Sequence, residues 1–183
     1  MKRIVLLILL LAFASFACGS SGADGSGGGG GEGAPEGGNQ PASKPTLPVI
    51  AAGDCSADPG PGVNYAKCDL TERNFSESDF SGANLAQAIF SNSNFSDSNF
   101  TNANLAGAFA GETNFLNADF TNADLTGADM SSSNLINANF TGAITLGVDF
   151  SGSNMTGAII TQEQLDQAYS IKDAILPDGS VGR

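Results

Sequence analysis

From Asn64 onward an apolar side chain recurs at every fifth position, and mostly small or polar residues separate these centres. A small residue usually stands two positions before each centre, Asn or Asp one before it, and Ser or Thr one after it. A period of five fits neither the 3.6 of a helix nor the 2.0 of a strand. The pattern therefore predicts a solenoid in which each pentapeptide forms one short side of a coil and ends in a turn. The centres are Tyr65, Leu70, Phe75, Phe80, Leu85, Phe90, Phe95, Phe100, Leu105, Ala110, Phe115, Phe120, Leu125, Met130, Leu135, Phe140, Thr145, Phe150, Met155 and Ile160.

The number of sides per coil follows from the spacing at which identical centres recur. Between Leu70 and Ile160, seven of fifteen pairs of centres twenty residues apart are identical, against four of sixteen pairs fifteen apart. Four sides per coil are therefore predicted, with coils about 4.8 Å apart. The aligned Phe rings are expected to form the core and not a platform for a cofactor or glycan, because they point inward. No cofactor is expected.

The repeated motif, seen in Ala83-Asn84-Leu85 and Ala123-Asp124-Leu125, resembles that of the pentapeptide-repeat family. The resemblance covers residues 64–160 and implies an all-β solenoid, a right-handed quadrilateral parallel β-helix with four pentapeptides per turn. No Pro occurs between Pro61 and Pro177, which is consistent with continuous backbone pairing between coils.

Both ends of such a solenoid expose unpaired backbone and need a cap. For the C-terminal cap, residues 161–183, Thr161 and Gln164 have the spacing of a capping box. A short helix is therefore predicted over residues 162–170. For the N-terminal cap, residues 51–63, Cys55 and Cys68 are expected to form a disulfide if the chain is exported, and two buried free thiols are the alternative.

The first residues have the features of an export signal. Lys2 and Arg3 precede an apolar run, Ile4 to Phe16, that is shorter than the roughly 20 residues of a membrane-spanning helix. Residues 1–17 are therefore interpreted as a signal peptide. Ser15-Phe16-Ala17-Cys18 resembles a bacterial lipobox, with Ser15 in place of the usual Leu, and the resemblance implies acylation of Cys18. Ordinary cleavage after Ala17 is the alternative.

Residues 18–50 are expected to be a flexible Gly- and Pro-rich tether. Gly accounts for 11 of the 20 residues from 19 to 38, so this stretch has little apolar surface to bury. A low-complexity insertion without a role is the alternative. Together with the acylated Cys18, the tether places the protein at the bacterial cell envelope, attached to the membrane by its acyl chains, and at the outer membrane if the host is Gram-negative.

Charge and composition exclude several classes of function. The chain has 19 Asp and Glu, 7 Lys and Arg and no His, and its formal net charge is −12. The lack of His excludes Ser-His-Asp and Cys-His nucleophiles and His-ligated metal sites. The negative charge excludes a basic surface for nucleic acid. Some pentapeptide-repeat proteins mimic duplex DNA and bind topoisomerases; an exported protein would not meet such a partner, so this function is a further alternative only if the chain is not exported.

Two sets of outward residues are candidate sites. Asp129 and Asp149 are twenty apart and should stack, either with a weakly bound Ca²⁺ between them or as solvated acids. Apolar residues also interrupt the outward polar positions and are candidates for contact with a partner or for self-association. One of them, Phe109, has an alternative position inside, beside the small Ala110. The apolar interruptions are Ile89, Phe109, Leu116 and Ile136.

The sequence thus predicts a non-enzymatic, membrane-anchored lipoprotein that presents an acidic rod to an unidentified protein partner. An enzyme or a dedicated metal-binding protein of the envelope is the alternative, but the filled core leaves no cleft for a substrate.

Overall fold

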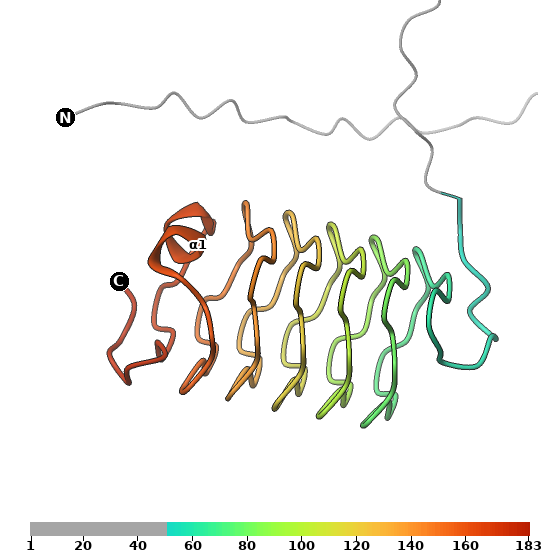
Figure 1. Ribbon diagram of the computed structural model, residues 1–183, viewed down its shortest axis with the longest axis horizontal. Coiled ribbons are helices and arrows are strands. Elements are labelled where there is room, and N and C mark those ends of the chain that lie inside the picture. The colour runs from blue at the N-terminus through green and yellow to red at the C-terminus, as the bar shows by residue number, and fades with distance from the viewer. Residues whose placement is uncertain (1–50) are drawn as a thin grey trace, which may run out of the picture. The chain divides into compact units, whose positions relative to one another are not determined.

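The chain forms a right-handed quadrilateral β-helix, which confirms the predicted fold class. The computed structural model describes residues 51–183, in which short-sided coils stack one on another along the axis of the solenoid (Figure 1). Parallel bridges join residues twenty apart, from Asn64 with Asn84 through to Asn139 with Ile159. Each side is one pentapeptide, so four sides complete a coil. The predicted signal peptide, the acylation site Cys18 and the tether lie outside the described residues.

The polar residues of the repeat form the corners. The Asn99 side chain accepts a hydrogen bond from the Thr101 N–H at 3.0 Å, which closes a turn beside the buried Phe100. Asn102 then takes a left-handed conformation, with φ of 58°, which Asn tolerates better than most residues. The backbone beyond the corner pairs with the next coil: Phe100 N–H donates to Asp119 C=O at 2.7 Å. Each pentapeptide therefore encodes its own turn.

Stacked rings fill the interior of the solenoid. The centroids of Phe100 and Phe120 lie 5.0 Å apart with their planes 11° from parallel, and Phe120 and Phe140 lie 5.2 Å apart. These rings are fully buried. Small inward residues complete the packing, and Ser98 satisfies its hydroxyl by donating to the Phe75 carbonyl at 2.8 Å. The column of Phe residues predicted from the twenty-residue spacing is the core.

The C-terminal end is closed by the helix α1, Gln162–Gln167. The predicted capping box is present: Thr161 accepts from the Gln164 N–H, and the Gln164 side chain accepts from the Thr161 N–H. The Gln164 side chain also donates to the carbonyls of Phe140 and Ala143, which ties the helix to the coil below. Within residues 51–183, no helix has the length and apolar character needed to cross a membrane.

The helix ends three residues earlier than predicted, because the chain returns to backbone pairing. Ala168 is already extended, and the Tyr169 N–H donates to the Val148 carbonyl at 2.8 Å. Beyond the helix the bridges join residues 21 apart, Asp149 with Ser170 and Asn154 with Ile175. The cap thus adds one residue to the coil.

Phe120→Ala should lower the free energy of unfolding by about 3–5 kcal/mol, because it leaves a cavity inside the ring column. Urea denaturation followed by circular dichroism measures the change. Phe109→Ala is the matched control, because Phe109 is 52% exposed and its truncation should cost far less. Equal losses in the two variants would contradict the assignment of the ring column as the core.

Candidate interaction surface

Ile89 and Phe109 occupy regular outward positions in one column. They form a parallel bridge, and the Phe109 N–H donates to the Ala88 carbonyl at 2.9 Å. Phe109 is 52% exposed and Ile89 40% exposed. Phe109 therefore points outward and does not fill the space beside Ala110, which is itself buried.

Leu116 and Ile136 are half-buried, so they are less exposed than Ile89 and Phe109, and their role as an interaction strip stays a prediction. They lie one position after their centres and are stacked in a column with neighbouring coils on both sides, and the Asn117 N–H donates to the Ile136 carbonyl at 2.9 Å. Both side chains are less exposed than that of Phe109.

Asp129 and Asp149 form a bridge between adjacent coils, as the twenty-residue spacing requires. One carboxylate oxygen of each accepts a hydrogen bond at 2.9 Å from the backbone N–H two residues ahead, at Ser131 and Ser151. Both carboxylates therefore close turns. Within residues 51–183, no three or more His, Cys, Asp or Glu side chains converge as metal ligands.

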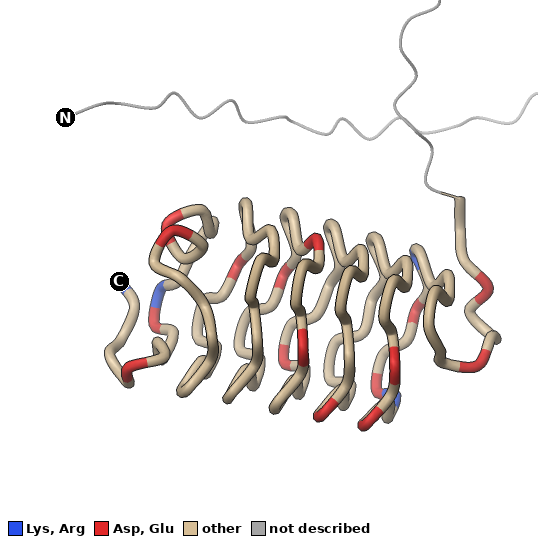
Figure 2. Tube along the Cα trace, viewed as in Figure 1, with Lys and Arg blue, Asp and Glu red and all other residues tan. Residues whose placement is uncertain are grey.

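Acidic residues are distributed along the coils, and the described basic residues lie toward the two ends (Figure 2). On the face opposite Asp129 and Asp149, amides alternate with carboxylates along the column that contains Asp79, Asn99, Asp119 and Asn139. The Asn99 amide donates to Asp79 at 3.0 Å, and the Asn139 amide donates to Asp119 at 3.2 Å. These amides separate the negative charges of that column, whereas Asp129 and Asp149 are direct neighbours.

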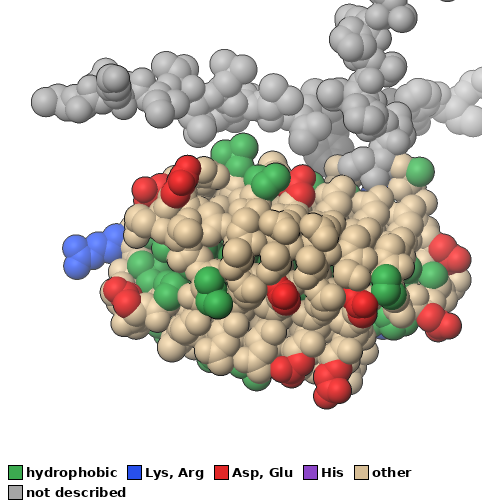
Figure 3. Space-filling model, viewed as in Figure 1, with side chains coloured by type: hydrophobic (Ala, Val, Ile, Leu, Met, Phe, Trp, Pro, Cys, Tyr) green, Lys and Arg blue, Asp and Glu red, His purple; other side chains and the backbone are tan. Residues whose placement is uncertain are grey.

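Several exposed apolar residues were not identified from the sequence. Apolar groups appear on an otherwise polar surface, several of them near the C-terminal end (Figure 3). Ile144 and Ile159 replace the outward Asn or Asp of the repeat, the same signal that identified Ile89, so the pattern contained them. Leu146 follows the centre Thr145, at the position that identified Leu116 and Ile136, so the pattern contained it as well. The remaining three lie within the C-terminal cap, where the repeat no longer predicts orientation. The additional exposed residues are Ile144, Leu146, Ile159, Tyr169, Ile175 and Val181.

Turn-closing hydrogen bonds lower the pKa of several exposed carboxyls. Asp69 accepts from the Thr71 hydroxyl at 2.6 Å and from the Thr71 N–H at 3.1 Å, and these bonds hold its pKa below 3.8. Such bonds favour the ionised form. Similar bonds lower the pKa values of Asp54, Asp79 and Asp178.

Thr71→Val should raise the pKa of Asp69 toward 3.8, because it removes the hydroxyl donor. A carboxyl with a lowered pKa in the folded state stabilises the protein above its unfolded pKa, and this contribution is lost as the pH falls through the folded pKa. As the pH is lowered below about 4, the free energy of unfolding of the variant should therefore fall less than that of the wild type. Carboxyl NMR titration measures the pKa.

Thr141→Val is the control for this titration. The Thr141 hydroxyl donates at 2.6 Å to the Asn139 amide oxygen, which does not titrate. A pKa of Asp69 that is unchanged in Thr71→Val would refute the assigned cause.

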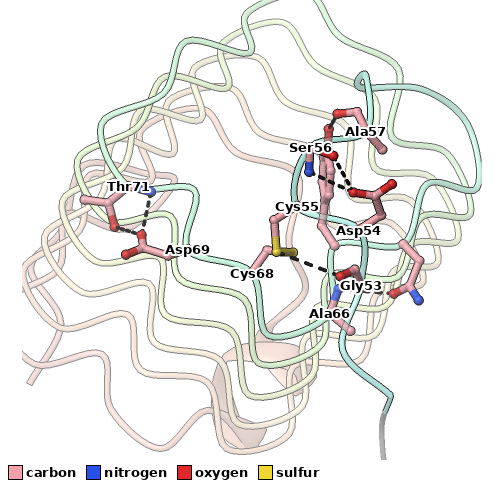
Figure 4. The surroundings of a disulfide bond; sticks show 11 residues. Gly53, Asp54, Cys55, Ser56, Ala57, Ala66, Cys68, Asp69 and Thr71 are labelled. Carbon is pink, nitrogen blue, oxygen red and sulfur yellow. Dashed lines mark hydrogen bonds between the residues drawn. A yellow bond between two sulfur atoms is a disulfide. The ribbon is translucent and has the colours of Figure 1, made fainter.

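A disulfide joins Cys55 to Cys68, with the Cα atoms 5.4 Å apart (Figure 4). Backbone pairing also attaches this N-terminal segment to the first coil: the Gly53 N–H donates to the Ala66 carbonyl at 2.8 Å. A Cβ atom at position 53 would collide with the Asn64 carbonyl, so only glycine permits this approach. The disulfide and the ladder together hold the cap over the first coil.

Reduction of this disulfide should lower the free energy of unfolding by about 3 kcal/mol, because the bond closes a short loop. Thermal melts with and without dithiothreitol measure the effect. The Cys55→Ser, Cys68→Ala double variant should melt near the reduced wild type and show no response to reductant. A wild-type melting temperature that does not change on reduction would contradict a stabilising role for the bond.

The sequence model for pentapeptide repeats matches the chain in eight copies, over residues 66–102, 98–135 and 133–168. No curated protein matches the sequence.

Solved structures similar to this chain are also pentapeptide repeat proteins. HetL, involved in heterocyst differentiation regulation in the cyanobacterium Nostoc sp. strain PCC 7120, is 22% identical, with a TM-score of 0.43. The match covers 66% of this chain and 64% of HetL, so the chain spans less than two thirds of that protein. A protein of the Arabidopsis thaliana thylakoid lumen is 35% identical over 52% of this chain and 73% of its own, with a TM-score of 0.33.

Proposed function

The chain belongs to the pentapeptide-repeat family, and from this premise we propose that it is a non-enzymatic interaction module held at the bacterial cell envelope by a lipid anchor. Its folded part is a rigid acidic surface that binds a protein partner. The anchor sets where the contact is made, and the coils set what is recognised.

The observation that carries the proposal is the filled interior. Rings such as Phe90, Phe100 and Phe120 are fully buried and in contact from coil to coil, so the space inside the described coils is occupied by side chains. Enzymes generally bind substrates in concave pockets with converging polar groups. In a solenoid filled in this way, the chemistry available to a partner lies on the outward columns.

The proposed anchor rests on the N-terminal sequence. Lys2 and Arg3, the apolar run from Ile4 to Phe16 and the following Cys18 resemble the signal of a bacterial lipoprotein. Two or more acyl chains give stable membrane attachment where one chain is marginal. A Gly-rich tether of about 30 residues has a root-mean-square reach of roughly 30 Å, enough to hold the coils clear of lipid headgroups.

Cys18→Ser should abolish lipid attachment. The full-length protein, expressed in a bacterial host with labelled palmitate, should carry label and sediment with membranes, whereas Cys18→Ser should lose both properties. Cys55→Ser is the control, because it also replaces one cysteine by serine yet should retain label. Unlabelled wild type released by cleavage after Ala17 would refute the anchor.

A further inference from the structure

One outward column of the solenoid combines apolar and acidic residues. Ile89, Phe109, Asp129 and Asp149 are joined by successive parallel bridges, so they lie on four consecutive coils, about 4.8 Å apart. We name these four residues the 89–149 column. Its N-terminal half is exposed and apolar, and its C-terminal half carries two adjacent carboxylates.

The fold does not require apolar residues at positions 89 and 109. In the same column, Asp69, Asp129 and Asp149 each accept a hydrogen bond from the N–H two residues ahead. Ile89 and Phe109 have no acceptor and give up this turn-closing bond. Their exposed apolar surface also gains nothing from burial in the core. A contact made outside the chain explains why these side chains are present.

A glycine lies close to the Asp129 carboxylate of the column. Gly111, one residue past the centre Ala110, replaces the Ser or Thr that occupies this position in the other coils of the column. A Cβ atom there would lie 3.4 Å from the Ser131 hydroxyl and 3.9 Å from an Asp129 carboxylate oxygen. The missing side chain therefore leaves the surface beside the Asp129 carboxylate uncovered.

The charge around the column selects a cationic partner. Asp129 and Asp149 are direct neighbours without an intervening amide, so their negative charges repel unless a cation approaches them. The sequence from residue 74 to residue 171 contains no Lys or Arg, so these coils supply no internal counter-charge. Glu112, at the next corner of the same side, adds a further negative charge.

We infer that the 89–149 column binds a basic peptide segment of a partner protein. One Lys or Arg lies against the face of Phe109, where ring and cation attract, and a neighbouring cation pairs with Asp129 and Asp149. The apolar stem of a long basic side chain packs on Ile89. The inference rests on the proposed function as an interaction module and names the surface and the chemistry of its partner.

Other occupants fit the column less well. A nucleic acid is repelled by the two carboxylates. Two copies of this chain in a symmetric dimer would each present the same acidic half to the contact, with no basic residue from the coils to balance it. A bare metal ion would not bind the exposed ring, and the column offers it only two carboxylates, both of which already close turns.

Binding of fluorescein-labelled hexalysine to the purified full-length protein, followed by fluorescence anisotropy at low ionic strength, tests the inference. Phe109→Asn and the Asp129→Asn, Asp149→Asn double variant should each weaken binding at least fivefold. All three substitutions introduce the residue that the repeat itself uses at this position, so the fold should be retained, which circular dichroism checks.

Two control variants carry the same chemical changes on the opposite face. Ile159→Asn removes an exposed apolar residue at the equivalent position, and Asp79→Asn with Asp119→Asn removes two charges. Both should change binding less than twofold. If the Asp79→Asn, Asp119→Asn variant weakened binding as much as the Asp129→Asn, Asp149→Asn variant, attraction by the overall negative charge would explain binding and the inference would be overturned. Unchanged binding in Phe109→Asn would also overturn it.

Analytical sedimentation of wild type and Phe109→Asn tests whether a second copy of this chain occupies the column. Wild type should have the same oligomeric state as the variant, whereas an oligomer that Phe109→Asn dissociates would make the column a self-contact and overturn the inference. These measurements need no membrane, so failure of the lipid anchor in Cys18→Ser experiments and failure of the binding site are separate results.

Discussion

Backbone hydrogen bonds between coils, which pair each residue with the one twenty positions away, hold the rest of the structure in place. The Phe100 N–H donates to the carbonyl of Asp119, and the Asp119 N–H donates to the carbonyl of Ser98. This alternating pairing places every residue over its counterpart in the neighbouring coil. Ring stacking, the small inward residues and the outward columns all depend on this register, because a shift of one residue would move each inward side chain to a corner or to the surface.

The two ends show what happens where this register stops. At the C-terminal end, α1 replaces one side of a coil and the separation becomes 21, after which pairing resumes at Ser170. At the N-terminal end, the disulfide and the close approach of Gly53 attach the first segment to the ladder. Both ends use local chemistry, a capping box and a covalent bond, to cover backbone that the repeat would leave exposed.

The outward columns are under much weaker constraint than the interior. An Asn or Asp before each centre closes a turn, but the ladder tolerates Ile89 and Phe109 without distortion, since both keep regular bridges. The fold therefore leaves the surface free to vary, and a function of this protein is expected where the outward residues depart from the turn-forming pattern.

The sequence by itself determined the period, the four sides, the Phe columns and the capping box. Each layer repeats the one before it, so twenty residues of pattern specify the whole interior. The twenty-residue spacing also places Ile89 with Phe109 and Asp129 with Asp149. Only the tertiary structure decided that Phe109 points outward, that Leu116 and Ile136 are half-buried, and that α1 ends at Gln167. Exposure and helix length depend on what neighbouring coils and the returning chain cover, and a local pattern does not record those contacts.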